Sequence, residues 1–168
     1  MNARVSIIMG STSDMSVMEK AAQFFDKMEI PFEINALSAH RTPQEVEKFA
    51  KEAKARGIEV IIAGAGMAAH LPGVVAAMTS LPVIGVPIKA SLDGIDALLA
   101  IVQMPPGIPV ATVAINGALN AAILAIQIMA NGDKSLQTKI EAYKASLKQK
   151  IVKANEDFSA VKYKFKVN

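Results

Sequence analysis

The 168-residue sequence contains no cysteine and no tryptophan, and only 5% of its residues are aromatic. The absence of cysteine excludes disulfides, thiolate catalysis and cysteine-ligated zinc sites. The first residues do not combine a basic segment with a following apolar one, which argues against secretion and predicts a cytoplasmic protein. With 52% apolar and 20% charged residues, the composition is that of a chain with a compact core, not of a disordered one.

Charged residues are also missing from two long stretches. No Asp, Glu, Lys or Arg occurs between Glu59 and Lys89 or between Asp96 and Asp133. Glycines, prolines and asparagines interrupt both stretches, so neither holds the roughly 18 consecutive apolar residues of a membrane span. We therefore expect no membrane-spanning segment, and the high apolar content points to contacts between subunits.

Apolar segments of two periodicities alternate along residues 1–132. Short runs with β-branched residues predict buried strands, and apolar residues at helical spacing follow each of them. This alternation predicts a three-layer, doubly wound parallel sheet of flavodoxin or Rossmann type, an α/β fold in a single domain that includes a C-terminal helix and tail at 133–168. A capping-box pattern at 42–45 opens the second helix. The expected strands are 5–9, 32–37, 60–63, 83–86 and 110–115, and the expected helices are 14–28, 42–57, 68–78, 93–103 and 117–130.

The C-terminal part differs in charge from the rest. Residues 133–168 carry 9 lysines against 4 acidic residues, whereas residues 1–132 carry 9 basic and 11 acidic ones. Apolar residues recur every three or four positions from Leu136 to Phe158, which predicts an amphipathic helix, and 161–167 alternate as in a strand or a docked tail. A nucleic-acid or membrane-surface arm would also be lysine-rich. Because no arginine cluster or aromatic platform accompanies the lysines, we expect neither nucleic acid nor membrane as a partner, and a helix packed on this subunit or a neighbour.

Ligands of open α/β sheets bind at the carboxyl ends of the strands, which makes the loops after the first three strands the candidate site. The first loop, Gly-Ser-Thr-Ser-Asp at 10–14, offers hydroxyls and helix N-terminal N–H groups to an anion such as phosphate. The alternative is that Ser13 or Asp14 merely caps the helix. The loop is neither a dinucleotide-binding glycine motif nor a Walker loop.

The second and third loops hold both histidines of the chain. In Ser-Ala-His-Arg-Thr-Pro at 38–43, Arg41 offers a fork to phosphate or carboxylate and His40 can exchange a proton near neutral pH; a solvated surface loop is the alternative. In the third loop, at 63–73, two glycines let the backbone approach a planar heterocycle. His70 in this loop is either a site residue or a structural histidine. Two histidines without neighbouring carboxylates argue against a metal site.

Four motifs together carry a family resemblance. They are Gly-Ser-x-Ser-Asp at 10–14, Ser-Ala-His-Arg-Thr-Pro at 38–43, Ala-Gly-x-x-x-Ala-Ala-His-Leu-Pro-Gly at 63–73 and Ile-Val-Gln-Met-Pro at 101–105. In this combination the sequence resembles the class I N5-carboxyaminoimidazole ribonucleotide mutase (PurE) family of purine biosynthesis, from about residue 4 to residue 131.

The resemblance implies a cofactor-free mutase that moves a carboxylate from the exocyclic nitrogen to C4 of an aminoimidazole ribonucleotide, through transient CO2. It implies that His40 protonates the departing nitrogen as general acid and then takes the C4 proton as base. Ser13, Ser38 and Arg41 would hold the phosphate of this ribonucleotide substrate, and Asp14 its ribose hydroxyls. The residues implied around the base and the migrating carboxylate are Ser11, Ala39, Gly64, Ala65, Gly66, His70 and Leu71.

The resemblance further implies a homo-octamer with active sites at subunit junctions, and an ATP-dependent carboxylating synthetase that supplies the labile substrate. The sequence departs from the family at Met67, where glycine is common, and in two shortened segments, 89–93 and 116–119. A direct carboxylase that uses CO2 is the alternative within the family, although Arg41 and the Ala-Ala-His-Leu-Pro segment favour the mutase. A mononucleotide-binding module without catalysis is the alternative from another class.

Overall fold

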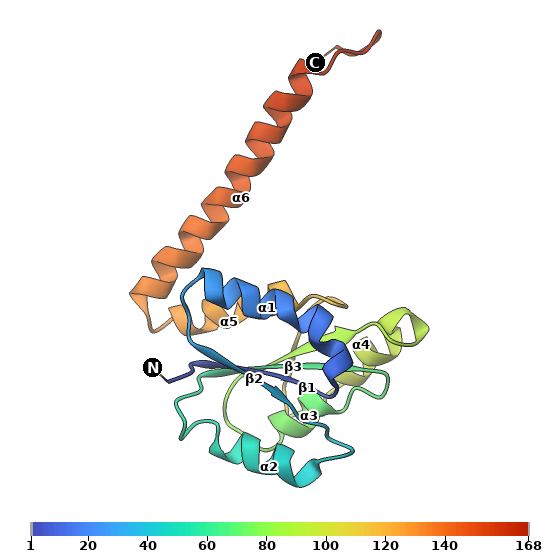
Figure 1. Cartoon of the computed structure of the whole chain (residues 1–168), viewed down its shortest axis with the longest axis vertical. Helices are drawn as coiled ribbons and strands as arrows, with labels where there is room; N and C mark the ends of the chain where they lie inside the picture. The colour runs from blue at the N-terminus through green and yellow to red at the C-terminus, as the bar shows by residue number, and fades with distance from the viewer. Residues whose placement is uncertain (1, 168) are drawn as a thin grey trace.

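A parallel sheet forms the centre of the computed structural model, which describes residues 2–167 (Figure 1). Its strands pair in the order β2-β1-β3-β4-β5, and every pairing is parallel. Helical crossovers join the strands, so the predicted doubly wound, three-layer α/β fold is confirmed. The strands are β1 (Val5–Met9), β2 (Phe32–Ala36), β3 (Val60–Gly66), β4 (Val83–Ile88) and β5 (Ala111–Thr112).

Helices cover both faces of this sheet (Figure 1). Helices α1 and α5 pack on one face and α2, α3 and α4 on the other, because their buried residues belong to two separate apolar clusters. Short 3-10 turns, η1 (Thr12–Asp14) and η2 (Leu92–Gly94), precede α1 and α4. The helices are α1 (Met15–Lys27), α2 (Pro43–Glu52), α3 (Leu71–Ala76), α4 (Ile95–Val102), α5 (Ala118–Ala130) and α6 (Lys134–Ala160).

The central strands are buried on both faces. Ile7 and Ile62 contribute to the cluster with α1 and α5, whereas their chain neighbours Ile8 and Ile61 contribute to the cluster with α2, α3 and α4. This alternation is the period of two of a strand, and burial on both faces explains the continuous apolar runs in the sequence. Burying one such side chain contributes roughly 1.5–3 kcal/mol, so these strands firmly hold the sheet edge from which the loops leave.

The last strand is shorter than the sequence predicts. Only Ala111–Thr112 of the expected strand 110–115 pairs with β4. The Pro87 carbonyl of β4 accepts a hydrogen bond from the Asn116 N–H at 2.8 Å, so the backbone of Pro87 faces the last strand. Proline has no N–H, so Pro87 cannot donate the next hydrogen bond of the ladder. The ladder therefore stops, and Asn116 leaves the strand direction with φ 57°.

Three predictions about the helices also need correction. α2 ends at Glu52 and not at residue 57, because residues 53–57 form turns. α3 begins at Leu71 rather than at residue 68, because Met67 has φ 55° and the chain between them forms a loop. The capping box expected at 42–45 does not form. The Thr42 hydroxyl instead accepts from the Ser38 N–H at 3.0 Å and donates to the Ser38 carbonyl at 3.1 Å, which closes the preceding loop.

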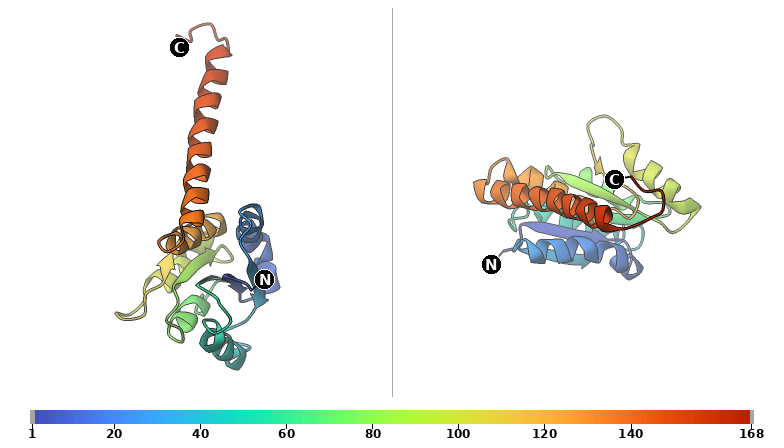
Figure 2. Two further views of the ribbon diagram at one scale, coloured as in Figure 1. Left: turned by 90° about the vertical axis from the view of Figure 1, so that its left-hand side faces the viewer. Right: turned by 90° about the horizontal axis from the view of Figure 1, so that it is seen from above.

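The C-terminal helix α6 leaves the rest of the fold (Figures 1 and 2). Asp133 caps it by accepting hydrogen bonds from the N–H groups of Ser135 and Leu136 at 3.0 and 3.2 Å. Leu136 and Ile140 are buried, and Tyr143 meets Phe24 of α1 edge to face at 4.9 Å between ring centroids. Among residues 2–167, the contacts of α6 with the rest of its own chain are therefore those of its beginning.

Beyond Tyr143 the predicted apolar stripe lies in the open. Leu147, Ile151 and Phe158 are exposed in this chain. Residues 161–167 form no strand, contrary to one of the two expectations, because the helix carries them away from every strand edge (Figure 2). Among the described residues, no helix combines the length and the apolar content needed to cross a bilayer.

Candidate active site

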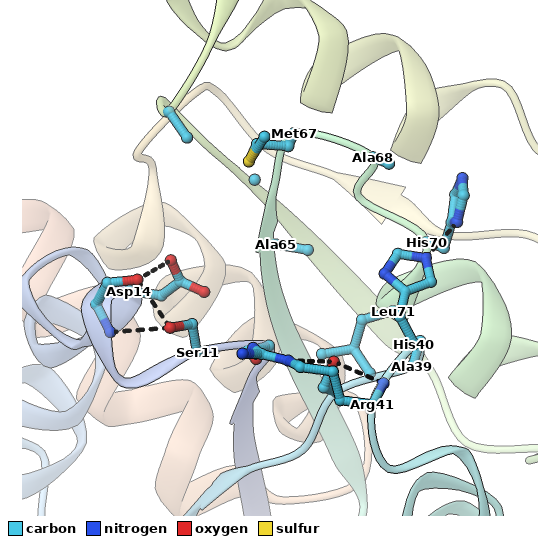
Figure 3. A pocket seen from close by; sticks show the side chains of 15 residues that line it. Ser11, Asp14, Ala39, His40, Arg41, Ala65, Met67, Ala68, His70 and Leu71 are labelled. Carbon is cyan, nitrogen blue, oxygen red and sulfur yellow. Dashed lines mark hydrogen bonds between the residues drawn. The ribbon is translucent and has the colours of Figure 1, made fainter.

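Three loops meet at the carboxyl end of the sheet, as the sequence predicts. The register places Met9 of β1 beside Ala36 of β2 and Gly64 of β3, so the loops that follow these strands start side by side. They enclose a cavity of about 530 Å³ (Figure 3). This volume is within the range of small-molecule sites.

The first loop presents hydroxyls and a carboxylate. Ser11 is the residue that caps η1: its Oγ accepts from the Ser13 N–H at 3.3 Å and from the Ser13 hydroxyl at 2.9 Å. Asp14 precedes α1 but makes no side-chain cap hydrogen bond. The alternative that Ser13 or Asp14 serves as a helix cap is therefore wrong, and both side chains face the cavity instead.

Partial burial changes the ionisation of the Asp14 carboxyl in this loop. It raises the pKa of the Asp14 carboxyl above its ordinary value, because the ionised form loses water. Hydrogen bonds from the Ser11 backbone and the Ser13 hydroxyl and the positive charge of Arg41 oppose the rise. A ligand that donates hydroxyl groups would supply the hydrogen bonds that this carboxylate lacks.

Arg41 joins the second loop to the first. Its Nη2 donates to the Gly10 carbonyl at 2.6 Å and its Nε donates to the Ser38 hydroxyl at 3.3 Å. The Arg41 backbone N–H also donates to Ser38 Oγ, at 3.2 Å. The guanidinium has five N–H donors, so three remain for an anion. With the hydroxyls of Ser13 and Ser38, it forms the cationic end of the cavity.

His40 of the second loop and His70 of the third loop contact each other at the wall of the cavity. His40 Nε2 and His70 Nδ1 lie 2.7 Å apart, with ring centroids 4.9 Å apart and the ring planes at 79° (Figure 3). Two nitrogens at this distance form one hydrogen bond, so one ring donates and the other accepts. The facing nitrogens of the pair therefore share one proton.

The third loop forms an apolar wall. Ala65 and Gly66 end β3 and line the cavity, and Met67, Ala68 and Leu71 continue it. A Cβ on Gly66 would lie 3.1 Å from the Ile88 carbonyl oxygen and 3.2 Å from Ala90 Cβ, so a side chain there would push the loop after β4 away.

The cavity gathers nearly all of the predicted site residues. Gly64 is the exception: it is buried inside β3, where a Cβ would come within 2.5 Å of Met18 Sδ, so its lack of a side chain serves packing and not the cavity. Of the other lining residues, Gly10, Met67 and Ala68 lie in the loops that the sequence marks as the site, whereas Ala90 lies outside them and was missed. Ala90 follows β4 at the same sheet edge, and its position after a buried strand is the one signal that marks it. The predicted residues in the wall are Ser11, Ser13, Asp14, Ser38, Ala39, His40, Arg41, Ala65, Gly66, His70 and Leu71.

The fold and the cavity together define a class of protein. A doubly wound sheet brings an exposed arginine, a half-buried carboxylate and two hydrogen-bonded histidines around one pocket at its carboxyl edge. This arrangement is typical of an α/β enzyme that acts on a small phosphorylated substrate by proton transfer. Among the described residues, no three histidine or carboxylate side chains come together as metal ligands.

Comparison with known proteins gives the family. The model of the AIR carboxylase family matches residues 4–150, and the chain belongs to this family. It is 52% identical over 166 residues to the N5-carboxyaminoimidazole ribonucleotide mutase of Thermotoga maritima, covering 98% of this chain and 97% of that one. It is also 52% identical over 161 residues to the phosphoribosylaminoimidazole carboxylase of Schizosaccharomyces pombe, but there it spans 29% of the relative. The crystal structure of Treponema denticola PurE superposes with a TM-score of 0.83 at 34% identity, covering 95% of this chain and 98% of that one.

Proposed function

We propose that the protein converts N5-carboxyaminoimidazole ribonucleotide to 4-carboxyaminoimidazole ribonucleotide in purine biosynthesis. The observation that carries this proposal is the meeting of His40 and His70, 2.7 Å apart, on the wall of the cavity that Arg41 and Ser13 also line. A mutase needs an anchored phosphate and, at the other end of the substrate, a group that both gives and takes a proton. The name of the Thermotoga maritima relative, which this chain matches over nearly its whole length, supports the same reaction.

Binding in this proposal follows the polarity of the cavity. The substrate phosphate lies against Arg41, Ser13 and Ser38, where three guanidinium N–H groups and the Ser38 hydroxyl are free to donate, and the Ser13 hydroxyl can donate once it turns away from Ser11 Oγ. The ribose hydroxyls donate to Asp14, whose half-buried carboxylate regains the hydrogen bonds that burial took from it. The aminoimidazole ring then lies along the apolar third loop, beside Ala65 and the histidine pair.

Catalysis follows in two steps. In the first, the bond between the exocyclic nitrogen and the carboxyl carbon breaks, CO2 leaves, and His40 gives a proton to the nitrogen. In the second, C4 of the ring attacks the same CO2, and neutral His40 takes the proton that C4 then loses. The proton count closes over the cycle, so no cofactor is required. General acid-base catalysis of this kind contributes roughly 10²- to 10⁴-fold.

Replacement of His40 by asparagine tests the catalytic role. We expect the His40→Asn variant to fold and to bind the ribonucleotide, because Arg41, Ser13 and Asp14 are untouched, while turnover falls by about 10²- to 10⁴-fold. Thermal melting and calorimetric titration with the product check folding and binding. A variant with unchanged turnover contradicts the role. A wild type that binds the nucleotide but converts nothing identifies a binding module instead.

The direct carboxylase is the second candidate, since the Schizosaccharomyces pombe relative carries that name. A direct carboxylase uses aminoimidazole ribonucleotide and CO2 from solution. It therefore needs an entry path for CO2 but no residues that bind an N-carboxylate. A choice between the two substrates distinguishes these activities.

We also propose that residues 1–132 are the catalytic core of a homo-octamer and that residues 133–168 are the arm that reaches a neighbour. The support is the exposed apolar side of α6, together with half-exposed Ile95, Leu99 and Val102 on α4. An ATP-dependent synthetase would supply the N-carboxylated substrate, because making a carbamate from an amine and bicarbonate releases water and coupling to ATP drives that step. A stable monomer in light scattering would contradict the assembly.

A further inference from the structure

The loop that follows β4 forms part of the cavity wall. Its residue Ala90 lines the cavity, and a Cβ on Gly66 would lie 3.2 Å from Ala90 Cβ, so the loop rests against the end of β3. A shift of this loop would therefore change the width of the cavity at its apolar side. The ladder between β4 and β5 ends at the pair of Gly85 and Thr112, so it does not hold the loop in place.

Asn116 takes over from the missing part of the strand. Its backbone N–H donates to the Pro87 carbonyl at 2.8 Å, and its side-chain Oδ1 accepts from the Lys89 N–H at 3.0 Å. In a parallel ladder, one residue bonds through its N–H and its carbonyl to two residues of the next strand that stand two positions apart. Asn116 reproduces this pattern with its side-chain oxygen in the place of the backbone carbonyl.

The backbone shows why a side chain is needed at this point. The preceding contact joins the Val113 N–H to the Gly85 carbonyl at 3.1 Å. From this contact to that of Asn116, β4 advances by two residues and the other segment by three, which ends the regular ladder. Asn116 has φ 57°, and asparagine is one of the few residues besides glycine that adopt positive φ readily. Asparagine thus provides both the conformation and the acceptor.

A second contact fixes the far end of the same loop. A Cβ on Gly94 would lie 2.7 Å from Ile115 Cγ2 and 3.2 Å from the Cα of Lys89. Ile115 therefore packs directly against Gly94, which is buried and has φ 86°. Residues 115 and 116 thus hold the loop 89–94 at both of its ends, and Lys89, which Asn116 binds, directly precedes Ala90.

We propose that Asn116 is a positioning residue of the active site: its side chain holds the loop 89–94, so that Ala90 stays against Gly66 and the cavity keeps its width around the base. This inference rests on the function proposed above, which places the aminoimidazole ring along this apolar wall. Asn116 is not among the residues that line the cavity, so it acts through Lys89 and Ala90.

The proposal separates the two halves of the substrate. Arg41 and Asp14 lie in other loops, so the contacts with the phosphate and the ribose do not depend on Asn116. A loosened loop would have to be ordered again when the base binds, and this cost lowers the affinity for the complete nucleotide. Loss of the contact should therefore weaken binding of the base and leave binding of the phosphoribosyl part unchanged.

Two substitutions separate the acceptor from the backbone conformation. Asn116→Gly adopts positive φ freely and removes Oδ1. Asn116→Asp tolerates positive φ as asparagine does and keeps a side-chain oxygen that accepts hydrogen bonds. The aspartate variant is therefore the matched control for the glycine variant.

Hydrogen exchange read by mass spectrometry tests the contact itself. We expect the Lys89 amide to exchange about 2- to 10-fold faster in Asn116→Gly, as the loss of one hydrogen bond allows, and at nearly the wild-type rate in Asn116→Asp. This measurement needs no substrate. Melting curves and light scattering check that both variants fold and assemble as the wild type does.

Ligand binding tests the consequence for the site. Calorimetric titration with the product, 4-carboxyaminoimidazole ribonucleotide, should show about 3- to 10-fold weaker binding to Asn116→Gly. Inhibition by ribose 5-phosphate, which lacks the base, should stay at the wild-type level. Asn116→Asp should match the wild type with both ligands. A residue that only stabilised the fold would change the melting temperature and neither affinity.

Three results overturn the proposal while leaving the function intact. The first is a Lys89 amide that exchanges at the wild-type rate in Asn116→Gly. The second is an equal change, or no change, in the affinities for the two ligands. The third is an Asn116→Asp variant that behaves as Asn116→Gly does, since the acceptor oxygen then plays no part. A wild type that does not bind the product instead refutes the proposed function, and the exchange experiment still tests the contact.

Discussion

Arg41 offers a quantitative test of the phosphate end of the site. The change is Arg41→Met, which removes the charge and the fork of donors while keeping an unbranched apolar stem. In the structure, one N–H is committed to the Gly10 carbonyl at 2.6 Å and one to Ser38 Oγ at 3.3 Å. These two contacts hold the guanidinium plane, and the three free donors are placed to form a two-bond contact with a phosphate.

The expected loss follows from these donors. A hydrogen bond to a charged group contributes roughly 1.5–3 kcal/mol, so two of them contribute about 3–6 kcal/mol. Arg41 is exposed to solvent, which screens the interaction and reduces the figure to about 2–3 kcal/mol. At 1.4 kcal/mol per tenfold change, substrate binding should weaken by about 30- to 150-fold.

Steady-state kinetics across a wide substrate range measure this effect. We expect KM to rise by that factor while kcat changes little, since the phosphate is far from the reacting atoms. Lys54→Met, in the exposed turn before β3 at the opposite edge of the sheet, removes the same charge away from the cavity and should leave KM unchanged. An Arg41→Met enzyme with wild-type KM would refute the assignment of Arg41 to the phosphate.

Two further predictions concern stability. Because burial raises the pKa of the Asp14 carboxyl, ionisation of this group opposes folding, and the free energy of unfolding should fall as the pH rises from 3.8 through the raised pKa. In urea unfolding experiments, Asp14→Asn should therefore be more stable than the wild type at pH 7 and equally stable near pH 3. In Gly85→Ala, the new Cβ would overlap the Ile101 methyl and lie 3.0 Å from Val110 Cγ1, which should cost about 1–3 kcal/mol. Gly132→Ala, with open space around it, is the control and should change stability by less.

The main features of the fold could be predicted because local signals and the sheet agree. The run 5–9 is apolar at four of five positions and is β1 to the residue, since both of its faces are buried. Elements whose ends or faces depend on contacts with another strand or another subunit were harder to predict. β5 ends early because Pro87 of another strand lacks an N–H, and the exposed side of α6 has no partner in this chain for the sequence to name.

The candidate site shows the same division. The sheet edge could be predicted because loops after neighbouring parallel strands meet there, whereas the roles of His40, Arg41 and Ser13 were predicted from the family motifs. The 2.7 Å contact between His40 and His70 was not, because it depends on how two loops fold toward each other. The family motif predicts Gly64 in the site. A Cβ at this position would collide with Met18, so the glycine is needed for packing of the core.

Substrate choice tests the central claim most directly. Purified protein is given N5-carboxyaminoimidazole ribonucleotide without added bicarbonate, and separately aminoimidazole ribonucleotide with saturating CO2. The mutase predicts rapid formation of the C4-carboxylated product from the first substrate, without dependence on added CO2. Product from the second substrate alone, with the N-carboxylated compound left unconverted, would contradict the account.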